Sequence, residues 1–272
     1  MYGSAGRLGV IEISSSVALS AELPGALPPN ALAVFARIRL PAQEVSVAAL
    51  DAMLSSRDLE VAAEQLADAD VDLITFACTS GSLIHGPGWD QKLIDRIHAA
   101  SGIPATTTTT AVVERLRVLG ARRIGIGTPY PEDVNEAERR FLEAMGFAVV
   151  HMQGLDLKTD REIGGLSLEQ VERLALSVAQ TRSDVVFLSC TNMPTLGLLD
   201  DLEKAVGRPV VSSNSATIWD ARRRLDAMTS TAGPHALRSA TVGAARLGGL
   251  RDGSSEQQLR PESVSPNPEG SH

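Results

Sequence analysis

Two stretches of this sequence repeat one pattern, an apolar run that ends in a cysteine followed by a threonine. "DLITFACTS" covers residues 72–80, and "DVVFLSCTN" covers residues 184–192. Neither run alternates apolar with polar residues, which is typical of strands buried on both faces of a parallel sheet. The two cysteines are separated by about the length of one small α/β domain. The repeat therefore predicts two similar halves, each with a central buried strand.

The rest of the chain supports this architecture, because short apolar runs alternate with longer segments of helical periodicity. We expect strands at residues 7–13, 71–78, 122–130, 147–155, 183–190 and 208–214. We expect helices at residues 46–70, 88–102, 106–120, 132–146, 167–182 and 198–207. This alternation predicts an α/β fold in which helices cover both faces of parallel sheets.

The composition limits the classes of partner. The chain has 272 residues, of which 43% are hydrophobic, and a formal net charge of −8. An acidic balance disfavours nucleic acid and membrane as partners, because nucleic acids and anionic membranes bind basic surfaces. No apolar stretch reaches the roughly 20 residues that span a bilayer. With no signal-peptide pattern and only two cysteines, we expect a cytoplasmic protein with free thiols.

Both cysteines lie where a buried strand ends and a loop begins. Ligands of open parallel sheets bind beyond the carboxyl ends of the strands, so Cys78 and Cys190 are candidates for one shared site. A single cysteine after an apolar run is more often a small buried hydrophobe, but the repeated Cys-Thr context favours function at both. A helix beginning in "NMPTLGLLDDL" would lie close to Cys190 and lower the pKa of its thiol.

Metal and nucleotide sites are disfavoured by the motifs. Neither cysteine has the CxxC or histidine spacing of a zinc site. The glycine-containing loops fit neither a P-loop nor a dinucleotide fingerprint. We therefore expect no metal and no cofactor.

Four segments carry a resemblance to a known family: "FACTSGS", "GARRIGIGTPYPEDVNE", "FLSCTNMPTL" and "RPVVSSNSATIWDARRRL". They resemble the aspartate/glutamate racemase superfamily, in its branch of maleate isomerases and arylmalonate decarboxylases. The resemblance runs from Gly9 to about Leu225. It implies two flavodoxin-like subdomains related by a pseudo-twofold axis, with the active site between them. The implied bounds are 1–118 (completed by 216–250) and 119–215, and the polar, proline-rich residues 251–272 predict a disordered tail.

The resemblance also implies roles for individual residues. Cys78 matches a cysteine of the isomerases and racemases where the decarboxylases carry glycine, and Cys190 matches a cysteine present in both groups. Three further residues match carboxylate-holding or oxyanion-hole positions, which the backbone N–H of Thr191 would join: Thr79, Ser80 and Tyr130.

Three more residues are candidates for substrate binding. Ser16 stands in the loop after the first strand, where the maleate isomerases carry a substrate-binding asparagine. Asn192 follows the second cysteine, and Asn214 is expected at a strand end on the same edge of the sheet. The departure at Ser16 leaves the identity of the carboxylate open.

Two cysteines predict a reaction in which protons are handled on both faces of a substrate. We expect a cofactor-independent isomerase or racemase of a small mono- or dicarboxylate, similar to maleate cis–trans isomerase. Either Cys78 adds to a double bond while Cys190 acts as general acid, or the two alternate as base and acid. The alternatives are an arylmalonate-type decarboxylase and a non-catalytic carboxylate-binding protein. Family analogy implies a homo-oligomer.

Overall fold

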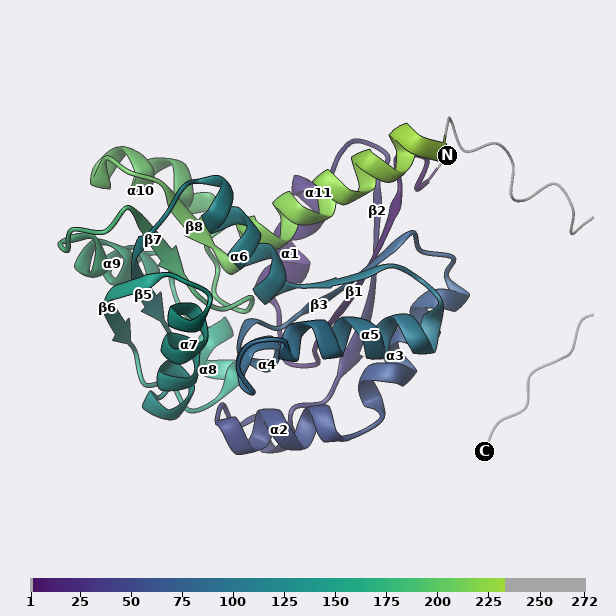
Figure 1. The fold of residues 1–272 in the computed structure, drawn as a ribbon, viewed down its shortest axis with the longest axis horizontal. Helices are drawn as coiled ribbons and strands as arrows, with labels where there is room; N and C mark the ends of the chain where they lie inside the picture. Colours follow the sequence, from purple (N-terminus) through teal and green to yellow (C-terminus); the bar gives the residue numbers. More distant parts are fainter. Residues whose placement is uncertain (1, 233–272) are drawn as a thin grey trace, which may run out of the picture. The chain divides into compact units, whose positions relative to one another are not determined.

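Two four-stranded parallel sheets form the framework of the structure, a computed structural model that describes residues 2–232. Their strand orders are β2-β1-β3-β4 and β6-β5-β7-β8 (Figure 1). The strands are β1 (Arg7–Ile13), β2 (Leu32–Ile38), β3 (Leu73–Ala77), β4 (Ala105–Thr107), β5 (Arg123–Thr128), β6 (Ala148–Gly154), β7 (Val185–Leu188) and β8 (Val210–Ser212). Counted from the first strand of each half, the two orders are the same, which confirms the predicted α/β fold with repeated halves.

Helices connect these strands. Before β5 they are α1 (Ala18–Ala26), α2 (Val47–Ser55), α3 (Asp58–Asp68), α4 (Thr79–Leu83), α5 (Trp89–Ser101) and α6 (Thr108–Val118), with the 3-10 turn η1 (Pro41–Gln43). After β5 they are α7 (Glu132–Ala144), α8 (Asp160–Gly164), α9 (Leu168–Ala179), α10 (Leu199–Val206) and α11 (Ser213–Ala232), with η2 (Leu196–Leu198). None of the helices within residues 2–232 is both long and apolar enough to cross a membrane.

The central strands are buried along their whole length, as the unbroken apolar runs predict. Every residue of β3 and of β7 is buried. A capping box is present at the start of α9, where the side chains of Ser167 and Gln170 each accept a hydrogen bond from the other residue's backbone N–H. These local signals and the apolar runs agree, so strand and helix positions in this half match the prediction closely.

Most predicted elements are a few residues shorter in the structure, and three differences change how the chain is divided. The expected helix 46–70 is two helices, because Ser56 has an extended backbone (φ −77°, ψ 172°) that ends α2. The expected helix 106–120 begins only at Thr108, since Thr106 and Thr107 pair with β3 as strand β4. The expected strand 208–214 ends at Ser212, so Asn214 lies in the first turn of α11.

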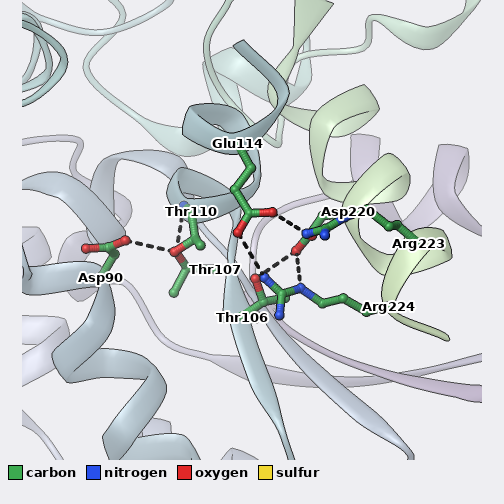
Figure 2. A network of polar contacts seen from close by, with 8 residues as sticks. All are labelled: Asp90, Thr106, Thr107, Thr110, Glu114, Asp220, Arg223 and Arg224. Atoms are coloured by element: carbon green, nitrogen blue, oxygen red, sulfur yellow. Dashed lines mark hydrogen bonds and ion pairs between the residues drawn. The ribbon is translucent and has the colours of Figure 1, made fainter. Parts of the chain in front are cut away.

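Helix α11 connects the two halves. It starts directly after β8 and packs against α6, α1 and β3. Figure 2 shows a contact of α11 with β4, where Thr106 donates a hydrogen bond to the fully buried Asp220 (2.9 Å). Arg224 donates to the same carboxylate (2.8 Å), and Glu114 of α6 pairs with Arg223 and Arg224. Helix α11 therefore packs against the first half, in line with the expectation that residues 216–250 complete the first subdomain. The bounds of the subdomains stay a prediction.

Two parts of the predicted organisation lie outside the described residues. These are the end of the completing segment, residues 233–250, and the expected tail, residues 251–272.

The segment that leads from η1 into α2 forms hydrogen bonds with the second half. Glu44 forms an antiparallel bridge with Thr159. The Val45 N–H donates to the Lys158 carbonyl (2.8 Å), and the Val47 N–H donates to Asp133 Oδ2 (2.9 Å). The neighbouring apolar side chains are thereby held over the carboxyl ends of the strands.

Candidate active site

A small pocket lies where four strands of the two sheets end. Ser16 follows β1, Cys78 follows β3, Tyr130 follows β5 and Cys190 follows β7. The full lining is Ile13, Ser16, Leu40, Val45, Leu50, Cys78, Thr79, Ser80, Tyr130, Asp160, Ile163, Cys190 and Thr191. Seven of the nine predicted site residues therefore share one pocket. Its free volume is about 10 Å³, the space of about one water molecule, so a substrate can enter only if the wall moves outward.

Cys78 is the residue that precedes helix α4. Its Sγ accepts a hydrogen bond from the Gly81 N–H (3.3 Å) and lies 3.8 Å from the Ser80 hydroxyl. Gly81 must be small, because a Cβ there would lie 3.0 Å from the sulfur. Burial raises the pKa of Cys78 to about 11, and the two hydrogen bonds counteract part of that rise. The thiol is therefore protonated at neutral pH in the unliganded site.

Cys190 has a strained backbone with φ of 140°, a conformation that residues with a Cβ rarely adopt. The Ser213 hydroxyl accepts the Cys190 N–H (3.0 Å), and the Cys190 sulfur accepts from the Asn192 N–H (3.4 Å). Burial raises its pKa even further than that of Cys78, and the nearby Asp160 carboxylate adds to the rise. Cys190 is thus the thiol that holds its proton more firmly.

The predicted helix begins inside "NMPTLGLLDDL", but not directly beside Cys190. Helix α10 starts at Leu199, while the segment after the cysteine forms a turn. The strained backbone of Cys190 and its bond to Ser213 direct the chain away from a helix at that point. The helix that starts at a thiol is instead α4, directly after Cys78.

Two of the hydroxyls near the pocket donate to protein groups, which leaves backbone N–H groups and Tyr130 as the donors for a carboxylate. Thr79 donates its hydroxyl to Ser213 (2.8 Å), and Thr191 donates its hydroxyl to the Ala77 carbonyl (3.0 Å). The backbone N–H groups of Thr79 and Ser80 lie in the first turn of α4, where a helix has no acceptors of its own. Burial raises the pKa of Tyr130 well above its usual value, so its hydroxyl stays a proton donor.

Ser16 is buried and lines the pocket with its hydroxyl unpaired. Its Oγ has no hydrogen-bond partner among the described residues. The backbone carbonyl of Ser16 accepts a bond from Arg37 (2.8 Å), which fixes the loop after β1. A buried hydroxyl without a partner is costly, and a polar group of a ligand would satisfy it.

Two predicted binding residues do not line the pocket. Asn192 is buried behind it, where its side chain accepts from the Val17 N–H (2.8 Å) and donates to the Asp160 carbonyl (2.8 Å). Asn214 donates to Glu22 (2.6 Å), because its place in the first turn of α11 directs it toward α1. In the structure, both side chains bond protein groups that fix the loops around the pocket.

Asp160 is the charged pocket residue that sequence reasoning missed. It is the first residue of α8 and is only 4% exposed. Its Oδ2 accepts a hydrogen bond from the Ser15 hydroxyl (2.6 Å), and burial raises its pKa. The Thr159–Glu162 capping box marks the helix start in the sequence. Nothing in that pattern indicates that the following aspartate faces a pocket.

Metal ligands are not gathered at this site. Within residues 2–232, no three His, Cys, Asp or Glu side chains form a group that could hold a metal ion.

Comparison with known proteins decides the family. The family model for arylmalonate decarboxylase matches residues 20–237, most of the chain. The chain belongs to the arylmalonate decarboxylase family. A maleate isomerase of Nocardia farcinica is 32% identical over 228 residues, which cover 81% of this chain and 90% of that protein. An arylmalonate decarboxylase of Bordetella bronchiseptica is 31% identical over 163 residues, 59% of this chain and 68% of that protein.

Solved structures of this family have the same fold. One is a cysteine-to-serine mutant of Nocardia farcinica maleate cis-trans isomerase with a covalently bound succinylcysteine intermediate. It has 28% sequence identity and a TM-score of 0.76, covering 81% of this chain and 93% of its own. A double mutant of arylmalonate decarboxylase in its liganded form has 27% identity and a TM-score of 0.74, covering 81% and 92%.

These findings confirm the resemblance, the fold and the enzyme class predicted from the sequence. The protein is an enzyme similar to maleate cis–trans isomerase, and arylmalonate decarboxylase is the alternative that the family names.

Proposed function

We propose that this protein is a cofactor-independent cis–trans isomerase of a small unsaturated carboxylic acid, with Cys78 as nucleophile and Cys190 as general acid and base. The observation that carries the proposal is the presence of two buried thiols, one from each half, in the lining of one pocket. A single thiol could protonate a carbanion but could not also add to the substrate.

In the first half of the reaction, Cys78 releases its proton to solvent, and the resulting thiolate adds to one carbon of the double bond. The electron pair of the double bond moves toward the carboxylate on the other carbon, which becomes an enediolate. The Cys190 thiol then gives its proton to that carbon. The product of these steps is a saturated thioether of Cys78, and Cys190 is left as a thiolate.

In the second half, the former double bond is a single bond and can rotate. The Cys190 thiolate takes back a proton from the carbon that it protonated. The electron pair re-forms the double bond in the trans geometry and expels the Cys78 thiolate. Cys78 is again a thiolate and Cys190 again a thiol, as at the addition step, so a turnover consumes no acid, base or redox partner.

The assignment of roles follows from the surroundings of the two thiols. The Cys78 sulfur accepts the Gly81 N–H at the start of α4, and its pKa is raised less than that of Cys190. Cys78 therefore ionises first, as a nucleophile must. Cys190 holds its proton, and the nearby Tyr130 hydroxyl lowers the pKa of Cys190, which favours its transient thiolate.

The enediolate needs donors at the substrate carboxylate. We assign this role to the backbone N–H groups of Thr79, Ser80 and Thr191 and to the Tyr130 hydroxyl. Each such donor is worth roughly 2.7–4 kcal/mol of transition-state stabilisation. Asn192 and Asn214 position the loops and do not touch the substrate.

Decarboxylation is the second candidate, because the family model is named for it. Cys78 is the observation against it, since a decarboxylase needs protonation from one side only. Racemisation by two alternating thiols would use the same pocket. The sequence-based expectations of a homo-oligomer and a cytoplasmic location belong to this proposal, and sedimentation velocity tests the first of them.

The test is proton NMR of small carboxylic acids in D2O with the wild-type protein, Cys78→Ala and Cys190→Ala. We expect cis–trans conversion without loss of carbon dioxide, abolished by either substitution. Release of carbon dioxide that survives Cys78→Ala would assign the protein to the decarboxylases. Exchange at an α-carbon without cis–trans conversion would assign it to the racemases.

A further inference from the structure

The pocket contains one carboxylate, Asp160, held in a fixed position. Its Oδ2 accepts the Ser15 hydroxyl (2.6 Å), and its backbone carbonyl accepts the Asn192 amide (2.8 Å). The side chain is only 4% exposed, and what remains exposed lines the pocket. Asp160 therefore faces whatever ligand the pocket takes.

No cation balances this carboxylate inside the pocket. The lining contains no lysine, arginine or histidine, and five of its members are the aliphatic residues Ile13, Leu40, Val45, Leu50 and Ile163. Arg37 approaches from outside, but its guanidinium pairs with Glu12 (2.7 Å) and with loop carbonyls. The field of Asp160 reaches both thiols, where it opposes ionisation.

A substrate with two carboxylates fits this lining poorly. One carboxylate can use the donors near Cys78 and Tyr130, but a second would meet Asp160 and aliphatic side chains. Two like charges in a site of low dielectric repel strongly. The second charge would also oppose formation of the Cys78 thiolate, as Asp160 already does.

We propose that Asp160 makes this enzyme selective for a monocarboxylate whose other end carries an N–H donor, such as a monoamide, over the corresponding dicarboxylate. The inference rests on the proposed function and specifies its substrate class. An amide N–H would donate to the Asp160 carboxylate. The amide carbonyl would accept from Ser16, whose buried hydroxyl has no other partner among the described residues and whose neighbour Ser15 bonds Asp160.

The test uses ligands that cannot react, so it does not depend on turnover. Succinate and its monoamide, succinamate, are titrated calorimetrically into the wild-type protein, Asp160→Asn and Asp160→Ser at neutral pH. Asp156→Asn is the matched control, because Asp156 is exposed, pairs with Lys158 and lies outside the pocket. Thermal melts of all variants establish that each is folded.

We expect the wild-type protein and Asp156→Asn to bind succinamate at least about tenfold more tightly than succinate. Both Asp160 variants are expected to lose this preference, mainly through tighter binding of succinate. Equal binding of the two ligands by the wild-type protein, or an unchanged preference in both Asp160 variants, would overturn the inference.

The outcomes separate this inference from the proposed function. Selective binding that depends on Asp160, without cis–trans conversion of any unsaturated acid, would overturn the isomerase and leave the specificity role intact. Cis–trans conversion with no preference for the monoamide would overturn the specificity role alone. If the wild-type protein binds neither ligand, the assignment of a carboxylate site is wrong and both fall.

Discussion

Tyr130 and Cys190 line the same pocket and come from the ends of neighbouring strands, β5 and β7, and the Tyr130 hydroxyl lowers the pKa of the Cys190 thiol against the rise that burial causes. Burial raises the pKa of Tyr130, so its hydroxyl keeps its proton and can donate a hydrogen bond to a neighbouring anion. Tyr130 is therefore placed to stabilise charge that appears on Cys190 when the thiol gives up its proton.

Tyr130→Phe tests this contact. The variant removes a donor both to the Cys190 thiolate and to the substrate carboxylate, so we expect kcat to fall about 10²- to 10³-fold. Steady-state kinetics by NMR measures the loss, and a thermal melt checks the fold. An unchanged kcat in a folded variant would show that the hydroxyl takes no part in the reaction.

Ser213 joins the two cysteine loops through one oxygen. Its hydroxyl accepts from Thr79 (2.8 Å) and from the backbone N–H of Cys190 (3.0 Å), and all three residues are buried. Ser213→Ala leaves both donors without their partner. Leaving a buried donor unpaired lowers the free energy of unfolding by about 1–3 kcal/mol. We expect urea unfolding to show a destabilisation in this range.

The matched control for Ser213 is Ser177→Ala. The Ser177 hydroxyl donates to Gln153 and to the Leu174 carbonyl near the surface of α9. We expect a change within about 0.5 kcal/mol for this variant. Equal effects of the two substitutions would contradict a special role for Ser213.

Glu138 makes stability depend on pH. Burial raises the pKa of this carboxyl from 4.5 to about 7, while the nearby Ser189 hydroxyl opposes the rise. Below pH 4.5 Glu138 is protonated in both the folded and the unfolded state, and its contribution to the stability of the fold is most favourable there. Between 4.5 and about 7 only the unfolded state ionises, so stability falls as pH rises, and above about 7 the loss is complete.

Glu138→Gln should remove this part of the pH dependence. A shift of this size corresponds to about 3 kcal/mol between mildly acidic and mildly alkaline pH, measured by urea unfolding at both pH values. Asp160 and Glu12 also have raised pKa values, so a smaller slope of the same sign should remain. Glu136→Gln, an exposed site on the same helix, should leave the slope unchanged.

The fold and most of the pocket could be predicted because they depend on local patterns. The unbroken apolar runs before Cys78 and Cys190 indicated buried parallel strands, and residues at the ends of such strands meet at one edge. Strand β2 was missed although Leu32–Ile38 is mostly apolar. As an edge strand it is only partly buried, and no cysteine or glycine signal marks its end.

The remainder depends on contacts between distant segments. Asp160 stands in the polar stretch "LKTDREI", which has the composition of an exposed loop, and it is held in place by Ser15 and Asn192 from other elements. Asn214 was misplaced because the end of a strand was predicted two residues too late. That shift turns the side chain from the pocket toward Glu22.

Covalent trapping on Cys78 tests the central claim most directly. The variant Cys190→Ser, which lacks the second thiol, is incubated with the monoamide of maleic acid and analysed by peptide mass spectrometry. We predict that the peptide containing Cys78 gains the mass of one substrate molecule, and that the double variant with Cys78→Ala gains none. An unmodified Cys78 peptide in a variant that still isomerises the substrate would contradict the two-thiol mechanism.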